Sequence, residues 1–188
     1  MAEGRGRPEQ RAAFLSGAVE HVLRHGVATL SLRPLAAALG TSDRMLLSYF
    51  GSREQLLAAV LGVVGEQLQA RFAAGLPAHP VSPAALVREL ATALRDPAAE
   101  APLRLYVEVG GLAARGHEPH RAVAAAVAGG WLSWLGSRLD VPDAERADAA
   151  AGVLAVVDGL LLVRFLAPGP AADRAAGWLA GRLGYPGG

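Results

Sequence analysis

Apolar residues return at helical spacing along almost the whole chain, and glycine or proline interrupts that spacing at short intervals. In the first such segment, Phe14, Ala18 and Val22 are four residues apart, which places them on one face of a helix. Gly26 follows this segment and can end a helix, because glycine adopts positive φ without steric cost. The pattern predicts a series of amphipathic helices, each burying one face against its neighbours.

The helically spaced apolar segments and the glycines and prolines between them predict about nine helices. No run of alternating β-branched residues interrupts the series except the brief AVVDGLLLV, whose place in a long uncapped stretch favours helix. The sequence therefore predicts an all-α fold. The expected helices run from Pro8 to Arg24, Leu32 to Leu39, Ser42 to Phe50, Arg53 to Ala74, Pro83 to Arg95, Pro102 to Arg115, Arg121 to Leu139, Asp143 to Leu166 and Ala172 to Leu183.

The composition is that of a folded protein of the cell interior. Hydrophobic residues make up 52% of the 188 positions, enough apolar surface to offset the entropy of ordering the chain. Cysteine is absent, which removes disulfides, thiolate metal sites and cysteine nucleophiles. MAEGRGRPEQR at the N-terminus has no apolar stretch for a signal peptide, and the apolar run from Val153 to Ala167 is shorter than the roughly 20 residues of a membrane helix. We expect a cytoplasmic protein without a membrane partner.

Charge is distributed unevenly although the net charge is only +1. Residues 1–56 hold seven arginines and five carboxylates, whereas the rest of the chain holds 11 arginines and 12 carboxylates. A mildly basic N-terminal segment is compatible with nucleic-acid binding, but so small an asymmetry does not identify it.

Two short predicted helices lie on either side of Gly40 and Thr41, after a first helix that can supply a core. This is the arrangement of a helix-turn-helix. Ser31 and Ser42 offer hydroxyl N-caps for the two helices, and Pro34 fits the first turn of the earlier one. The inward residues are expected to pack together and to leave the outer face of the second helix free. The inward set is Leu32, Leu35, Ala36, Leu39, Leu46 and Phe50, and the outer face carries Arg44, Met45 and Ser48, with Leu47 and Tyr49 at its edges.

The segment ATLSLRPLAAALGTSDRMLLSYFGSREQLL resembles the DNA-binding head of the tetracycline-repressor family, most strongly over residues 11–60. The matching positions are Gly26, Ser31, Leu32, Ala36, Gly40, Leu46, Tyr49, Phe50, Ser52, Glu54 and Leu56. The resemblance implies an N-terminal three-helix head joined to a helical body that binds a ligand and forms a homodimer. We therefore expect residues 1–52 to be the DNA-binding domain with an N-terminal arm, and residues 53–188 to bind the ligand and dimerise.

The resemblance also implies which residues touch operator DNA. The backbone contacts carried over by position are Ser31, Thr41, Tyr49 and Arg53, and the residues near bases are Arg33, Arg44, Met45 and Ser48; Ser42 and Leu47 complete the expected DNA-binding set. Arg44 is the favoured base reader, because a bidentate arginine on guanine contributes about 1–3 kcal/mol of discrimination.

Asp43 and Leu47 depart from the family, which commonly has a basic residue and an aromatic hydroxyl at these positions. Both changes remove an expected phosphate partner, although an apolar Leu47 suits a thymine methyl group. The arm GRGRPEQR leaves two alternatives open, a solvated tail or contact of Arg5 and Arg7 with the minor groove or phosphates.

In the family the last two helices usually pair with their copies across a two-fold axis. Small residues that permit close helix approach occur here at Ala149, Gly152, Ala155, Gly159, Gly177 and Gly181. Packing within the chain and compositional bias remain alternative explanations of these positions.

The effector is expected to be a small apolar or amphipathic molecule. Candidate ligand residues are aromatic or ionisable side chains within apolar stretches, namely Arg104, Tyr106, Glu108, Trp131, Trp134 and Asp158. Each of these residues also has a structural explanation. The aromatic rings commonly fill cores, Arg104 and Glu108 can form an ion pair, and a buried Asp158 can bond to a helix cap or an arginine.

No cofactor, metal or catalytic activity is expected. The histidine pairs His21 with His25 and His117 with His120 lack a third ligand nearby, and the sequence has no HExxH, nucleophile elbow, P-loop or complete GxGxxG. The sequence predicts a ligand-responsive transcriptional regulator, more readily a repressor than an activator. The alternative is a helical small-molecule binding protein with weakened DNA affinity.

Overall fold

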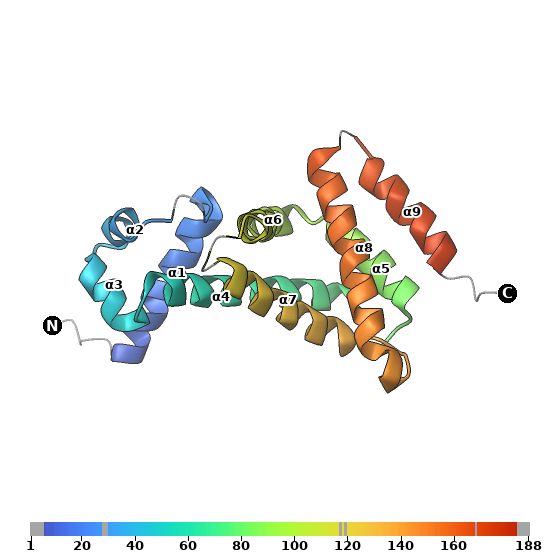
Figure 1. Cartoon of the computed structure of the whole chain (residues 1–188), viewed down its shortest axis with the longest axis horizontal. Coiled ribbons are helices and arrows are strands. Elements are labelled where there is room, and N and C mark those ends of the chain that lie inside the picture. The colour runs from blue at the N-terminus through green and yellow to red at the C-terminus, as the bar shows by residue number, and fades with distance from the viewer. Residues whose placement is uncertain (1–5, 28–29, 117, 119, 168, 184–188) are drawn as a thin grey trace. The chain divides into compact units, whose positions relative to one another are not determined.

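The computed structural model describes residues 6–27, 30–116, 118, 120–167 and 169–183. These residues form nine α-helices and two 3-10 turns, η1 and η2, and the predicted all-α fold is confirmed (Figure 1). The elements are α1 Arg7–His25, α2 Leu32–Ala38, α3 Asp43–Phe50, α4 Arg53–Gly75, α5 Pro83–Ala93, η1 Pro97–Ala99, α6 Glu100–Ala114, α7 His120–Gly136, η2 Asp143–Glu145, α8 Arg146–Leu166 and α9 Ala171–Leu183.

Serine caps fix two of the predicted helix starts. The Oγ of Ser42 accepts the N–H of Met45 at 3.2 Å, and the Oγ of Ser52 accepts the N–H of Gln55 at 3.1 Å. Ser31 occupies the N-cap position of α2, but its hydroxyl makes no cap hydrogen bond, so the cap predicted there is wrong. Pro34 at the third helical position removes one of the two N–H groups to which an N-cap oxygen can bond.

Several later helices begin or end a few residues away from the predicted position. α6 starts at Glu100 and not at Pro102, because the carboxylate of Asp96 caps η1 by accepting the N–H of Ala98 at 2.9 Å, and η1 continues directly into the helix. Pro102 is tolerated in the first turn of α6, where its missing N–H leaves no bond unmade. α5 and α7 end before the predicted Arg95 and Leu139, and Asp143 begins η2 instead of an α-helix.

The chain divides into two compact units. Unit 1 comprises residues 1–67 and 104–127, and unit 2 comprises residues 68–103 and 128–188. Their boundaries fall within α4, α6 and α7, because these helices are long enough to contribute to both units. The division into a DNA-binding segment 1–52 and a ligand-binding segment 53–188 concerns function and stays a prediction.

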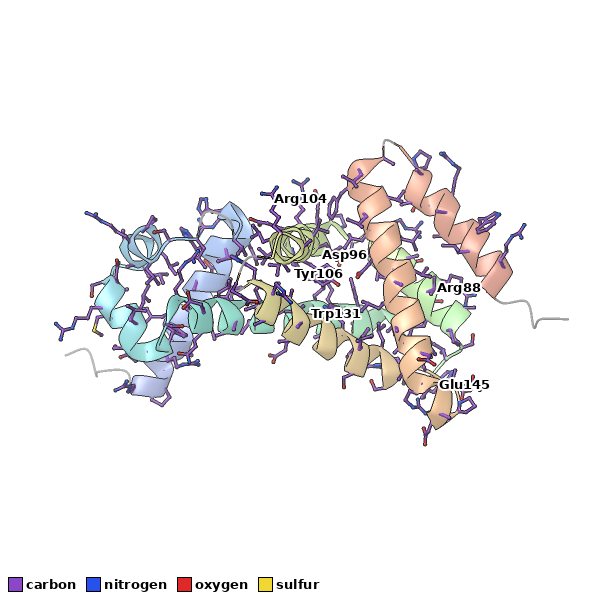
Figure 2. The ribbon with its side chains drawn as sticks, viewed as in Figure 1. Arg88, Asp96, Arg104, Tyr106, Trp131 and Glu145 are labelled. Atoms are coloured by element: carbon purple, nitrogen blue, oxygen red, sulfur yellow. The ribbon has the colours of Figure 1, made fainter. Side chains whose placement is uncertain are left out.

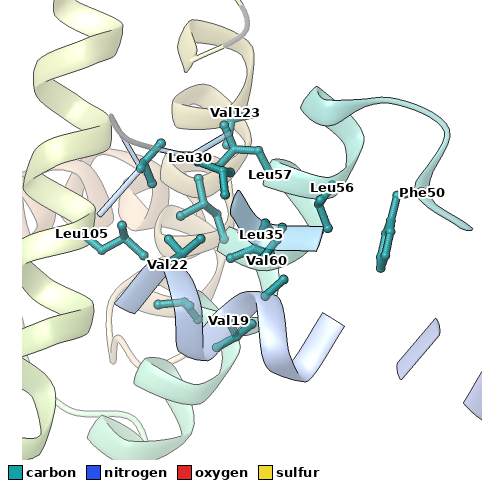
Figure 3. Close-up of a cluster of buried hydrophobic side chains, with 14 of the residues drawn as sticks. Val19, Val22, Leu30, Leu35, Phe50, Leu56, Leu57, Val60, Leu105 and Val123 are labelled. Atoms are coloured by element: carbon teal, nitrogen blue, oxygen red, sulfur yellow. The ribbon is translucent and has the colours of Figure 1, made fainter. Parts of the chain in front are cut away.

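Unit 1 is built on a single hydrophobic cluster (Figure 3). Leu35 of α2 and Leu46 of α3 are completely buried in it, and Leu32 and Leu39 pack against it, as predicted. Further members come from α1, the segment between α1 and α2, the first half of α4, α6 and α7. These include Val19, Val22, Leu56, Leu57, Val60, Leu105 and Val123.

Unit 2 is centred on α5, α8 and α9, which pack on one another (Figure 1). α5 contributes Leu86, Val87 and Leu90 to the interior, while Arg95 at its end lies 3.4 Å from the carboxylate of Asp173 on α9. The face that α8 buries is also apolar. It consists of Ala150, Val153, Val157, Leu160 and Leu161.

Two helical stretches of the described residues reach the length and hydropathy of a membrane span, Arg53–Gly75 and Asp143–Leu166. This is weak evidence for a membrane, because core helices pass the same test. Leu56, Leu57 and Val60 account for the apolar character of the first stretch, since they belong to the core of unit 1. Only 28% of the second stretch is buried inside the protein, so much of its apolar surface faces outward.

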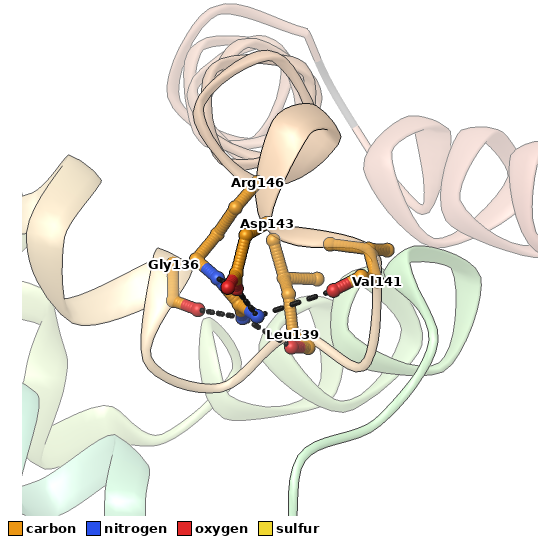
Figure 4. A network of polar contacts seen from close by, with 5 residues as sticks. All are labelled: Gly136, Leu139, Val141, Asp143 and Arg146. Atoms are coloured by element: carbon orange, nitrogen blue, oxygen red, sulfur yellow. Dashed lines mark hydrogen bonds and ion pairs between the residues drawn. The ribbon is translucent and has the colours of Figure 1, made fainter.

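Arg146 holds the link between α7 and α8 together (Figure 4). Its Nη1 donates to the carbonyls of Gly136 at 3.1 Å and Leu139 at 2.8 Å, and its Nη2 donates to the carbonyl of Val141 at 3.1 Å. The carboxylate of Asp143 accepts from Nη2 at 2.7 Å and keeps the guanidinium in place. One side chain thus bonds to the carbonyl of the last residue of α7 and to two carbonyls of the turn that follows it.

We expect Arg146→Met to lower the free energy of unfolding by about 2 kcal/mol, because it leaves these partly buried carbonyls without their charged donor. The measurement is urea unfolding followed by circular dichroism. Arg88→Met is the matched control, because Arg88 makes only an exposed ion pair with Glu89 at 3.5 Å and should change stability by less than about 0.5 kcal/mol. Equal losses in the two variants would contradict the role assigned to Arg146.

Candidate nucleic-acid interface

α3 presents one buried face and one open face. Leu46 is completely buried and Phe50 is 6% exposed, whereas Met45 and Leu47 are 42% and 38% exposed. Arg44 and Ser48 are also exposed. The structure therefore brings the predicted base-reading side chains of α3 together on its outer face.

The serine hydroxyls of α3 are oriented by its backbone. Ser48 donates its hydroxyl hydrogen to the carbonyl of Met45 at 2.8 Å, so its oxygen faces outward as an acceptor. Ser42 accepts a bond from the N–H of Met45 and still has its own O–H to donate. At the start of α3 Ser42 thus presents a hydrogen-bond donor, as a phosphate contact requires. Ser48, further along the helix, presents an acceptor.

Three of the expected contacts outside α3 lie at the N-cap of α2, on α2 and in the turn that follows it. Ser31 and Arg33 are exposed, and Thr41 is half-buried. Gly40 has φ +63°, and this left-handed residue lets the N–H of Thr41 bond to the carbonyl of Ala36 at 2.9 Å. The turn that sets α3 against α2 therefore depends on glycine.

Arg53 has a structural bond that sequence reasoning missed. Its Nε and Nη2 both donate to the carbonyl of Leu30, at 3.1 and 2.7 Å. The guanidinium joins the start of α4 to the residue before the N-cap of α2. Because the two residues are 23 positions apart in sequence, no local pattern predicts this bond. The proposed phosphate contact of Arg53 would have to use its remaining N–H groups.

Charge at the start of α4 includes an ionised carboxylate. The backbone N–H of Glu54 itself and the hydroxyl of Ser52 hold the pKa of Glu54 below its usual value. Glu54 and Asp43 both lie in the first turns of their helices, where the helix dipole favours negative charge. Each also places a negative charge next to residues expected to meet phosphates.

The N-terminal arm is only partly described. Arg5 lies outside the described residues, whereas Arg7 is the first residue of α1 and its side chain contacts the end of α3. Arg7 is therefore not part of a solvated tail.

The six candidate ligand residues are divided between the two units. Arg104, Tyr106 and Glu108 belong to unit 1, where Arg104 is exposed and the other two are half-buried (Figure 2). The carboxylate of Glu108 accepts the N–H of Val27 at 3.0 Å. A Cβ at Gly26, whose φ is +79°, would lie 2.8 Å from this carboxylate, so glycine there serves both the turn and the close approach.

Trp131, Trp134 and Asp158 belong to unit 2. Trp131 is 8% exposed and packs edge-on against Trp134 with 5.5 Å between ring centroids, and the ring centroid of Phe72 lies 6.0 Å from that of Trp131. Asp158 is half-exposed and not deeply buried, which corrects the expectation of a carboxylate inside an apolar helix. Asp158 thus lies on a partly exposed face of α8.

The histidine pair on α1 is close but has no third ligand. The rings of His21 and His25 are 4.6 Å apart, and burial lowers the pKa of His21, as do the nearby charges of His25 and Arg24. His117 lies outside the described residues. Both ring nitrogens of His120 are buried without a hydrogen-bond partner. Within the described residues no three histidine or carboxylate side chains form a group that could hold a metal ion.

Comparison with known families identifies the head. Residues 14–60 match the family model described as bacterial regulatory proteins, tetR family. The head, residues 14–60, is therefore of the TetR type. The matched segment runs from α1 into α4 and contains α2, α3 and their turn, so the expected resemblance is confirmed.

Solved structures share the fold of nearly the whole chain. A transcriptional regulator of Streptomyces coelicolor A3(2) has 23% identity and a TM-score of 0.72, with 94% of this chain and 98% of that chain covered. A TetR-family regulator of Cytophaga hutchinsonii has 18% identity and a TM-score of 0.68, with 96% of each chain covered. The multidrug binding protein EbrR complexed with proflavin has 29% identity and a TM-score of 0.67, with coverage of 92% and 98%. A comparison with curated proteins finds no match.

Proposed function

We propose that this TetR-family protein is a cytoplasmic repressor that binds a palindromic operator as a homodimer and is released by a small apolar or amphipathic molecule. The observation that carries the proposal is the open outer face of α3, which displays Arg44, Met45 and Ser48 on a helix anchored by Leu46 and Phe50. A rigid short helix with a polar outer face is what major-groove reading requires.

The contacts divide into those that position the protein and those that read sequence. Arg44 is assigned to a guanine edge and Leu47 to a thymine methyl group, because these side chains are exposed and chemically suited to them. Further contacts with the phosphates and with adjoining bases are assigned to Tyr49 of α3 and to five residues outside this helix, Ser31, Arg33, Thr41, Ser42 and Arg53. Asp43 and Glu54 oppose phosphate binding, so we expect fewer backbone contacts than a fully basic head would make.

The DNA-binding proposal predicts that the purified protein prefers its own promoter region to random DNA at moderate salt. Arg44→Ala should weaken promoter binding by about 10- to 100-fold and leave random DNA binding almost unchanged, because it removes a base contact. Fluorescence anisotropy with labelled duplexes measures both affinities. Arg24→Ala is the charge-matched control, because Arg24 is exposed at the far end of α1, where its side chain donates to the carbonyl of Glu20 in the same helix.

A wild-type protein without promoter preference, together with an Arg44→Ala variant that changes nothing, would refute the regulator proposal. The alternative would then be a helical small-molecule binding protein with weakened DNA affinity. Asp43 and the apolar Leu47 on α3 are the residues that favour this alternative.

The homodimer is assigned to α8 and α9. An exposed stripe follows α8 at spacings of three and four residues, which place it on one face. Its members are Gly152, Ala155, Gly159, Leu162 and Leu166. A Cβ added at Gly152 or Gly159 would meet nothing within 4 Å, so packing within the chain does not explain these glycines.

α9 continues this surface with the same combination of small and large residues. Trp178 is 60% exposed beside the exposed Gly177, and Leu166 at the end of α8 is 80% exposed. Small residues allow close helix approach, and large exposed apolar side chains mark surfaces that become buried in an interface. A symmetric pairing of two such surfaces would set two heads about 34–36 Å apart, the spacing of successive major grooves on one face of DNA.

The dimer proposal predicts that Gly159→Leu converts the protein to a monomer, because the new side chain prevents close approach of α8 to its copy. Helix content should not fall, since leucine favours helix over glycine by about 1 kcal/mol. Sedimentation equilibrium gives the mass and circular dichroism the helix content. Gly129→Leu on α7, another exposed glycine with no atom within 4 Å of an added Cβ, should remain a dimer. A dimeric Gly159→Leu protein would contradict this interface.

The effector is assigned to the aromatic cluster of Phe72, Trp131 and Trp134, because EbrR, at 29% identity, has been solved with proflavin. Planar aromatic ligands pack well against tryptophan rings. A ligand that favours a conformation with mis-spaced heads would weaken operator binding by about 5- to 150-fold.

Proflavin, added to the DNA-free protein, is the probe for this assignment. In Trp178→Phe, which retains Trp131 and Trp134, we expect saturable quenching of tryptophan fluorescence. In the double variant Trp131→Phe/Trp134→Phe, only Trp178 remains and little quenching is expected. Equal quenching in the two proteins would place the ligand away from the cluster.

A further inference from the structure

The first turn of α1 is joined to the last turn of α3. Nη2 of Arg7 donates to the carbonyl of Ser48 at 2.9 Å, a bond between residues 41 positions apart. The guanidinium of Arg7 also lies over the ring of Tyr49, with its Cζ 5.5 Å from the ring centroid. Arg7 thus holds both a backbone group and a side chain of α3.

Two more residues of α1 reinforce this contact. Phe14 packs edge-on against Tyr49 with 5.4 Å between ring centroids, and the Cζ of Arg11 lies 4.9 Å from the ring centroid of Phe50. Residues 7, 11 and 14 follow one another at helical spacing and therefore share one face of α1. That face meets the three consecutive residues that end α3, Ser48, Tyr49 and Phe50.

An eight-residue helix needs such support. Isolated helices of this length are not stable in water, and the last carbonyls of any helix lack partners within it. At the end of α3 the N–H of Gly51 bonds to the carbonyl of Leu47 at 2.8 Å, and Arg7 bonds to the next carbonyl, that of Ser48. The partial negative charge at a helix C-terminus strengthens a bond from a cation.

We propose that Arg7 is a positioning residue of the recognition helix: it anchors the C-terminal turn of α3 through the Ser48 carbonyl and the Tyr49 ring, and it does not contact DNA. The inference rests on the proposed DNA-binding function of α3. By holding the end of α3, Arg7 keeps Ser48 directed toward the bases and Tyr49 toward a phosphate. A cation at the start of α1 would then affect sequence recognition through α3.

Arg7→Ala and Arg7→Lys test the proposal, with Arg24→Ala as the control that removes an exposed arginine from the other end of α1. Hydrogen exchange of the α3 amides in the DNA-free protein is the first measurement. We expect exchange in the C-terminal half of α3 to rise about tenfold in Arg7→Ala. Lysine lacks the planar group that both stacks and donates, so Arg7→Lys should restore only part of the protection, and Arg24→Ala should leave α3 unchanged.

DNA binding as a function of salt is the second measurement. We expect Arg7→Ala to lose about tenfold in promoter affinity, to lose little affinity for random DNA and to keep the salt dependence of the wild type. Circular dichroism establishes that the overall helix content is retained.

Unchanged α3 exchange in Arg7→Ala would overturn the proposal. So would a salt slope that falls by about 1 in Arg7→Ala and recovers in Arg7→Lys, because that result identifies a phosphate contact. If the wild-type protein shows no promoter preference, the DNA-binding function fails, and the exchange measurement still decides whether Arg7 anchors α3.

Discussion

The burial of Leu46 and Phe50 is the constraint on which the rest of the head depends. α3 has eight residues and cannot hold its own shape in water, so its outer face is oriented only because its inner face is fixed in the core of unit 1. α2 supplies Leu35 to the same core, and α6 and α7 contribute Leu105 and Val123. The direction in which Arg44 points is therefore set by packing that extends far beyond the helix-turn-helix.

Sequence periodicity predicted the helices because capping and glycine chemistry are local. Ser42 and Gly40 act as their neighbours in sequence indicate, whereas Ser31 makes no cap bond and Pro34 removes one of the N–H groups open to it. The contacts that hold α3 and its neighbours were not predictable in this way. Arg7 reaches across 41 positions and Glu108 meets Val27 across 81, and no periodic pattern encodes pairs so distant.

Outward-facing apolar surface distinguishes α8 and α9 from the helices that fill the cores. Gly152 and Gly159 are exposed with open space around them, and the exposed Leu166 and Trp178 add apolar area to the same two helices. The sequence identified the small residues, but it did not distinguish close packing inside the chain from packing against a second copy. The exposure of these positions supports the proposed packing against a second copy.

The central claim is that α3 of two protomers reads one operator. Hydroxyl-radical footprinting of the protein's own promoter region tests it most directly, because it reports protected sugars along each strand. The account predicts two protected stretches on one face of the duplex, about one helical turn apart and related by a two-fold axis. Uniform cleavage at protein concentrations that saturate nonspecific binding, or a single unpaired stretch, would contradict it.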